Sequence, residues 1–402
     1  MKHVRRILFF LLSAVVGAAF TGPPQAQPAL QASNVNIAYQ FGQQITFLAR
    51  LSSSVPIQQA FLSFRDVNEQ TTRLVPLTPG PDGSTVYQYD ASQHLLPPFA
   101  TIEFSYQATL ADGQGATAGP FYFKYADNRF GWKDLSDGEV SVHWYNGDPS
   151  FGQAALDAAR AGLQNMSQTL PVSLNAHVDV YIYANFDDLV SSLSLGGRPW
   201  EAGHADPSIG VAMLAVAPGD TQSLDLRRLV PHELTHIMLY RSLGAGFNSL
   251  PTWLEEGLAA AEELDPNPDY ASALEAASKN NSLLPIMDLC TSFPADSGRA
   301  FLAFAEAQSF VRFLRDQYGS TGIVALTKAY ADGLDCDLGA TRAVGMPLDQ
   351  LEARWRENVL GQNVFGVASR NLLPYVIILG LTLIVPIWGA IGVITAGRKN
   401  AR

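Results

Sequence analysis

The stretch PHELTHIMLY, residues 231–240, places two histidines four positions apart, with a glutamate directly after the first. The spacing of the surrounding apolar residues predicts a helix over residues 226–240. His232 and His236 would lie one turn apart on the side opposite the apolar face, so they face something other than the core. The apolar face consists of Leu226, Val230, Leu234, Ile237 and Met238.

Two imidazoles at positions i and i+4 can reach one zinc ion through their ring nitrogens. Glu233 lies about 100° further round the helix. From there its carboxylate can contact a metal-bound water without ligating the metal, as a general base must. The motif therefore predicts a catalytic zinc site with His232 and His236 as ligands and Glu233 as the base.

A catalytic zinc needs a third protein ligand and an open position. The segment LPTWLEEGLAA, residues 250–260, predicts a second helix, because Pro251 suits a first helical turn and apolar residues follow at helical spacing. Glu255 and Glu256 both lie near its N-terminal end. Helical spacing alone leaves open which of the two is the ligand.

HELTH followed by WLEEGLA resembles the gluzincin metallopeptidases, in particular the peptidase MA-like family, which pair H-E-x-x-H with W-L-x-E-G-x-A. The resemblance spans roughly residues 130–359. It implies a zincin-like α+β domain that hydrolyses peptide bonds with one Zn²⁺ ion. It assigns Glu256, separated from His236 by nineteen residues, as the third ligand. Glu255 then takes the variable position, as a solvated or substrate-facing carboxylate.

The sequence departs from these relatives in two respects. Relatives often carry a tyrosine where this chain has Phe304, so the donor to the tetrahedral oxyanion is unassigned. The candidates for that donor are His204, Tyr240 and Tyr270. The G-x-M-E-N sequence of aminopeptidase relatives is missing, and SIGVAMLAV, residues 208–216, takes its place. We expect the strand within it to hold an extended substrate at a sheet edge.

The N-terminal part predicts a separate β domain. Over residues 30–126, runs such as ATIEFSYQATL alternate apolar and polar residues, and the turn sequences PGPDGS and ADGQG separate them. About seven short strands suggest an immunoglobulin-like sandwich without its cysteine pair, serving as a spacer or binding a protein partner. The zincin-like α+β domain would follow over residues 127–365.

Both chain ends predict targeting segments. Residues 1–26 read as a signal peptide, with an uncleaved anchor helix as the alternative. Residues 372–397 are uncharged and mostly apolar, which predicts a single transmembrane helix rather than a buried core helix. The basic residues among 398–402 would then form a cytoplasmic tail, with the N-terminal domains outside the cell membrane.

The cysteine count and the charge add two expectations. In an oxidising compartment Cys290 and Cys336 would form a disulfide, and two free buried thiols are the alternative. The formal net charge of −11 argues against nucleic acid or an anionic membrane surface as the main partner.

These observations predict a membrane-anchored extracellular zinc peptidase that acts on a peptide or protein substrate. The alternative is a surface binding or adhesion protein whose zinc fold is inactive or only structural. The intact Glu233 favours the peptidase, because a chain that has lost hydrolysis no longer needs a general base there.

Overall fold

The computed structural model describes residues 30–170, 176–193, 203–362, 372–380 and 382. The chain divides into two compact units. One comprises residues up to Tyr125 except Pro97–Phe99, and the other comprises Pro97–Phe99 together with the chain from Ala126 onward. The predicted signal peptide over residues 1–26 lies outside the described part.

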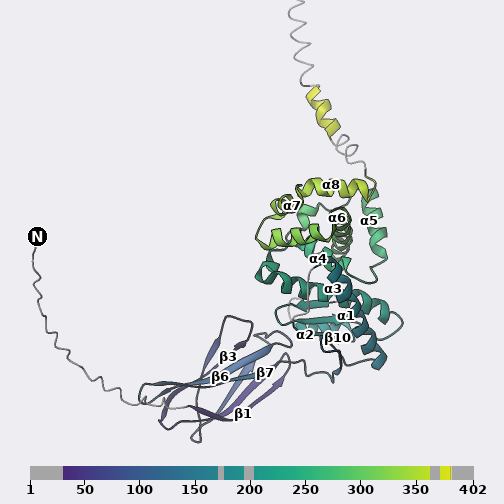
Figure 1. The fold of residues 1–402 in the computed structure, drawn as a ribbon. Coiled ribbons are helices and arrows are strands. Elements are labelled where there is room, and N and C mark those ends of the chain that lie inside the picture. The colour runs from purple at the N-terminus through teal and green to yellow at the C-terminus, as the bar shows by residue number, and fades with distance from the viewer. Residues whose placement is uncertain (1–29, 171–175, 194–202, 363–371, 381, 383–402) are drawn as a thin grey trace, which may run out of the picture. The chain divides into compact units, whose positions relative to one another are not determined.

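The first unit is built from seven strands in two antiparallel sheets, with the orders β1-β2-β5 and β4-β3-β6-β7 (Figure 1). Its strands alternate buried and less buried residues along their length, most regularly in β6, as expected when one face packs on a core. The core between the sheets is apolar and includes Phe47, Phe64 and Phe104. The strands are β1 Gln31–Gln40, β2 Gln44–Ser52, β3 Ile57–Asp66, β4 Arg73–Leu77, β5 Ser84–Asp90, β6 Thr101–Leu110 and β7 Gly115–Lys124.

The second unit begins with a mixed five-stranded sheet of order β11-β12-β10-β9-β8. The three central strands are parallel, and the edge strands β11 and β8 run antiparallel to their neighbours. Parallel strands need crossover connections, and α1 and α2 supply them. The strands are β8 Lys133–Ser136, β9 Val140–Trp144, β10 Val178–Tyr183, β11 Gly203–Asp206 and β12 Val211–Ala215.

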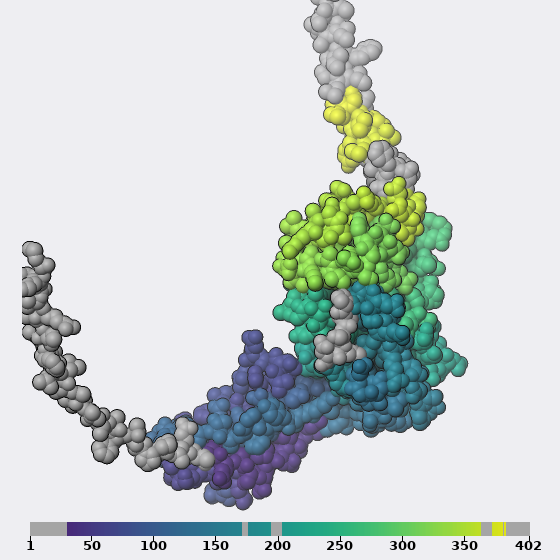
Figure 2. All heavy atoms as spheres, in the orientation of Figure 1, coloured from purple at the N-terminus to yellow at the C-terminus, as the bar shows by residue number. Residues whose placement is uncertain are grey.

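Helices make up the rest of the second unit. In Figure 1 the sheet and α1 lie at one end of this unit, α7 and α8 lie at the other, and α3 and α4 run between them. Figure 2 shows the same division on the surface, where teal residues adjoin green ones. The helices are α1 Pro149–Thr169, α2 Phe186–Leu193, α3 Gln222–Leu243, η1 Gly244–Ser249, α4 Thr252–Ala261, α5 Asp269–Asn280, η2 Ile286–Leu289, α6 Ser297–Ala331, α7 Cys336–Val344 and α8 Leu348–Asn358.

The packing of α1 against α3 depends on a glycine. A Cβ atom added at Gly162 of α1 would lie 2.8 Å from the Cβ of Pro231 in α3, so only glycine permits this approach. At its start α1 is capped by Asp148, whose side chain accepts a hydrogen bond from the Phe151 N–H at 3.1 Å, and Pro149 follows in the first turn. The helix that carries the two histidines is therefore held close to α1 and the sheet.

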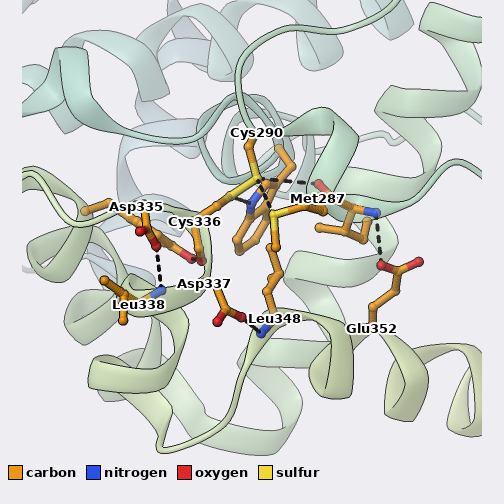
Figure 3. Close-up of a disulfide and its surroundings, with 11 residues drawn as sticks. Met287, Cys290, Asp335, Cys336, Asp337, Leu338, Leu348 and Glu352 are labelled. Atoms are coloured by element: carbon orange, nitrogen blue, oxygen red, sulfur yellow. Dashed lines mark hydrogen bonds between the residues drawn. A yellow bond between two sulfur atoms is a disulfide. The ribbon is translucent and has the colours of Figure 1, made fainter.

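The two cysteines form a disulfide in this unit, as Figure 3 shows. Cys290 follows η2 and Cys336 begins α7, with their Cα atoms 6.3 Å apart and a sequence separation of 46. A disulfide that closes a loop of this length in the unfolded chain typically contributes about 2–4 kcal/mol to the free energy of unfolding. The bond ties the segment after α5 to the last two helices.

The prediction of a transmembrane helix over residues 372–397 is wrong. Among the described residues, no helix is both long enough and apolar enough to cross a membrane. Residues 372–380 of the predicted range are helical. The remainder of that range, with the tail at 398–402, lies outside the described part apart from residue 382. The β-rich N-terminal region and the α+β domain of the predicted fold are present.

Candidate active site

Helix α3 presents its two histidines to a pocket. The apolar residues on its opposite face are almost fully buried, which fixes the rotation of the helix. His232 and His236 both line a pocket of about 430 Å³, with ring centroids 5.3 Å apart. As predicted, the histidines and the apolar residues therefore lie on opposite sides of α3.

Helix α4 brings a carboxylate to these histidines. The Oε2 atom of Glu256 lies 3.4 Å from Nε2 of His232 and 3.7 Å from Nε2 of His236. One ligand atom from each of the three residues falls within 4.8 Å of the others. Ligands about 2.0–2.1 Å from a tetrahedral zinc are roughly 3.3 Å apart. The three residues thus fit a zinc ion without rearrangement of the backbone.

Two further glutamates contact the outer nitrogens of the histidines. Oε1 of Glu263 lies 3.3 Å from Nδ1 of His232, and Oε1 of Glu255 lies 3.1 Å from Nδ1 of His236. An acceptor beside Nδ1 holds the ring proton there, which leaves Nε2 free to ligate a metal. Glu255 therefore supports His236 while its partly exposed side chain also lines the pocket. The sequence did not predict a role for Glu263. The one sequence feature that pointed to it is the acidic pair Glu262–Glu263 directly after α4.

The electrostatics of the pocket favour a cation. Burial by itself lowers the pKa of His232, but its hydrogen bonds to Glu256 and Glu263 outweigh burial and raise the pKa well above its ordinary value. The pKa of His236 is also raised, because the charge of Glu256 and the hydrogen bond to Glu255 outweigh burial. A metal that binds here must displace protons from the imidazoles, so its affinity falls as the pH falls.

Glu233 is buried beside the histidines and lines the same pocket. Its carboxylate packs on the backbone of Gly203 in the edge strand β11. A Cβ atom at residue 203 would collide with the Glu233 carboxylate, so glycine is required at this position for the observed placement. Gly203 belongs to no recognisable sequence motif, and its role is evident only from its contact with Glu233.

Helix α4 is anchored at several points along its length. Gly257 lets it approach α6, since a Cβ there would lie 2.7 Å from the Ala307 carbonyl oxygen. At its start the Thr252 N–H donates to the Cys290 carbonyl at 3.0 Å, and Trp253 Nε1–H donates to Cys336 Sγ at 3.3 Å. The disulfide and the glycine therefore help to set the position of Glu256.

A buried ion pair holds the end of α4. The carboxylate of Glu262 accepts hydrogen bonds from Arg315 Nη1 at 3.2 Å and from Asn165 Nδ2 at 2.8 Å. Both carboxylate oxygens are satisfied in this arrangement, which a fully buried charge requires. This glutamate connects α4 to α6 and α1 and does not line the pocket.

The three candidates for the oxyanion donor are not equally placed. His204 and Tyr270 line the pocket, whereas Tyr240 is not among its lining residues and packs on Phe247 with ring centroids 5.8 Å apart. Phe304 also lines the pocket, with its ring centroid 6.2 Å from that of His232. His204 is exposed, and partial loss of hydration lowers the pKa of its ring, although the charge of Asp206 opposes this shift.

The strand expected to hold substrate is not at an edge. β12, which contains most of the predicted 209–216 strand, pairs with β10 on one side and with β11 on the other. The backbone groups on both sides of β12 are therefore already paired within the sheet. β11 is the edge strand next to the pocket, and its residues Gly203 and Ala205 line it. A four-residue strand with mixed polarity showed too little alternation to be predicted.

Comparison with known proteins agrees with this geometry. The family profile described as the Peptidase MA superfamily matches residues 158–361, which is more than half of the chain. The matched range contains both histidines, Glu233 and Glu256. The chain belongs to the peptidase MA superfamily. A comparison with curated proteins gives no match.

Similarity to solved structures is weak. Wild-type OgpA from Akkermansia muciniphila is 18% identical, with a TM-score of 0.21, over 24% of this chain and 28% of that one. An aminopeptidase N family protein from Idiomarina loihiensis is 10% identical, with a TM-score of 0.30, over 85% of this chain and 75% of that one. The match thus spans less than a third of the length of OgpA.

Proposed function

We propose that this chain is a zinc-dependent peptidase. The observation that carries the proposal is the convergence of His232, His236 and Glu256 from two helices, with ligand atoms within 4.8 Å of one another, in a pocket that Glu233 also lines. Membership of the peptidase MA superfamily supports the same reaction class. An ordinary ion-pair network would not need two histidines whose outer nitrogens are each held by a separate carboxylate.

The metal would be held by His232, His236 and Glu256. A zinc ion bound there supplies a Lewis acid for the peptide carbonyl and lowers the pKa of a bound water. Glu233 accepts a proton from the attacking water and delivers it to the leaving nitrogen, so it acts first as a base and then as an acid. Glu263 and Glu255 keep the histidine tautomers fixed while the proton moves.

The substrate would bind in extended form along β11. Within the described residues this strand ends the sheet beside the pocket, so we expect its outer backbone groups to pair with a peptide. Gly203, which supports Glu233, belongs to the same strand. A peptide paired with β11 would therefore pass close to the proposed base.

We further propose that the protein acts outside the reducing cytosol. The support is the disulfide between Cys290 and Cys336, because such bonds persist mainly in oxidising compartments.

The test combines metal analysis with hydrolysis of an unstructured protein such as casein. The purified chain should contain one zinc per molecule and cleave casein. A chelator should abolish cleavage, and added zinc should restore it. Zinc without any cleavage would contradict the peptidase and favour a binding protein with a structural metal.

A further inference from the structure

One cation in the pocket has no function in the proposed mechanism. Arg228 lies on α3 one turn before His232, and it lines the same pocket. Its side chain is 19% exposed. A guanidinium withdrawn from water to this extent normally has close acceptors, because the loss of hydration is costly.

Arg228 has few partners among the described residues. Its single ion pair there joins Nη1 to Oδ1 of Asp225 at 4.0 Å, which is too long for a hydrogen bond. Its Nε atom is buried and has no acceptor within the described part of the chain. The guanidinium therefore retains donors that a ligand in the pocket could use.

Two neutral donors line the same pocket. The Oδ1 atom of Asn267 accepts from the Asp269 N–H at 3.0 Å, and no acceptor for its Nδ2 occurs among the described residues. Tyr270 packs on Phe301 with ring centroids 5.0 Å apart, and its hydroxyl likewise has no partner in the described ranges.

The charge of the pocket wall at Arg228 is opposite to that of the wall around the histidines. Around the histidines the pocket presents the carboxylates of Glu233, Glu255, Glu256 and Glu263, which suit a cation. Within the described ranges, Arg228 is the only arginine or lysine that lines the pocket. Its planar guanidinium matches a carboxylate in two parallel hydrogen bonds. An anionic group on a bound molecule would satisfy donors that the protein leaves open.

We propose that Arg228, assisted by Asn267 and Tyr270, forms a subsite for a carboxylate of the peptide substrate. The proposal rests on the proposed peptidase function. Side chains one helical turn apart have Cβ atoms about 5–6 Å from each other. An extended peptide advances about 3.3–3.6 Å per residue. The recognised carboxylate therefore belongs to a residue within one or two positions of the scissile bond.

Two parts of a peptide can supply this carboxylate. One is the side chain of an aspartate or glutamate near the scissile bond, and the other is the terminal carboxylate of a short product-side segment. Both place the same planar anion at Arg228, and synthetic peptides separate them. A glutamate replaced by glutamine tests the first, and a free C-terminus replaced by an amide tests the second.

The experiment measures kcat/KM of the zinc-loaded full chain on such matched peptide pairs. With the wild-type chain, the acidic member of at least one pair should be cleaved about tenfold to a hundredfold faster, the range of a charge-assisted hydrogen bond. Arg228→Gln should bring this ratio close to one while zinc content stays unchanged. Asn267→Ala should reduce the ratio by a smaller factor, which provides a second variant if Arg228→Gln folds poorly.

Arg227→Gln is the matched control. Arg227 is the neighbour in sequence, but it is 44% exposed and pairs with Asp265 at 2.5 Å. Its loss should leave the acid-to-amide ratio unchanged. A wild-type ratio near one for every pair would overturn the subsite, as would a ratio that survives Arg228→Gln. If the wild type cleaves no peptide, the proposed function itself fails, and the subsite fails with it.

Discussion

The two compact units differ in what they bury. The first unit buries an almost wholly apolar core, and the buried polar residues in its described part are Ser63, Asp66 and Thr85. The second unit buries one histidine of the site together with the carboxylates of Glu233, Glu262, Glu263 and Glu306. Burying ionisable groups is unfavourable unless they are partnered or serve a purpose. The contrast locates the candidate chemistry in the second unit.

Burial alone does not define the site, however. Glu306 is fully buried but does not line the pocket. Its Oε1 atom accepts a hydrogen bond from the Leu284 N–H at 2.9 Å, and burial raises the pKa of its carboxyl to about 8. What distinguishes the site is convergence, because Glu256 contacts both histidines, while Glu263 contacts His232 and Glu255 contacts His236.

The largest effect expected follows from removal of a metal ligand. His232→Ala, His236→Ala and Glu256→Ala each delete one of three protein ligands, so bound zinc and hydrolysis should both fall to background. Metal analysis and casein cleavage measure this. Glu275→Ala is the control, since the Glu275 side chain is 68% exposed and its one ion pair among the described residues is with Lys279. A ligand variant that keeps full zinc content would disprove the ligand set.

A core substitution in the first unit tests whether that unit can be destabilised without loss of the site in the second unit. Phe47 is 1% exposed and packs against Phe64, Phe104 and Phe123. Phe47→Ala should lower the free energy of unfolding of that unit by about 3–5 kcal/mol. Denaturant unfolding followed by spectroscopy gives this value. Zinc content and peptide hydrolysis should stay unchanged, and their loss would show that the site depends on the first unit.

A smaller effect is expected from the glutamates behind the histidines. Glu263→Gln and Glu255→Gln keep the shape of the side chain but weaken the hold on Nδ1, so zinc affinity should fall about tenfold to a hundredfold. Competition with a chelator of known affinity measures the change. Unchanged zinc affinity in both variants would mean that these carboxylates do not orient the ligands.

The smallest effect concerns Glu306 and depends on pH. Its pKa in the folded chain, about 8, exceeds the ordinary value of 4.5, so the fold favours the neutral form. The stability from this group is complete below about pH 4.5 and is lost as the pH rises towards 8, by up to about 1.4 kcal/mol per unit.

Glu306→Gln should remove that slope. The variant should match the wild type in Tm near pH 5 and exceed it at pH 8, as measured by thermal unfolding at both pH values. Glu275→Gln, at an exposed position, should shift Tm little at either pH. An identical difference between Glu306→Gln and wild type at both pH values would refute the raised pKa.

Much of the architecture was predictable because it follows from periodicity. The alternation in β6 and the helical spacing of Leu226, Val230 and Leu234 both arise from one face packing on a core. The edge strand β11 escaped prediction, since four residues show too little alternation. At residues 372–397 the apolar character did not correspond to a membrane-spanning helix among the described residues.

The site was predictable only as far as local motifs reach. Residues four apart on one helix are neighbours whatever the fold, so His232 and His236 could be paired from the sequence. The contacts of Glu263 with His232 and of Gly203 with Glu233 depend on how separate elements pack. No spacing rule relates residues in different elements, so these contacts, and the position of Arg228 in the pocket, needed the structure.

The most direct test of the account is Glu233→Gln, measured for zinc stoichiometry and peptide hydrolysis on the same sample. The glutamine keeps the shape of the side chain but cannot accept the proton from water. The account predicts one zinc per chain, as in the wild type, with hydrolysis reduced by about 10²- to 10⁴-fold. Hydrolysis at the wild-type rate with zinc bound would contradict the assignment of Glu233 as the base, and with it the proposed peptidase mechanism.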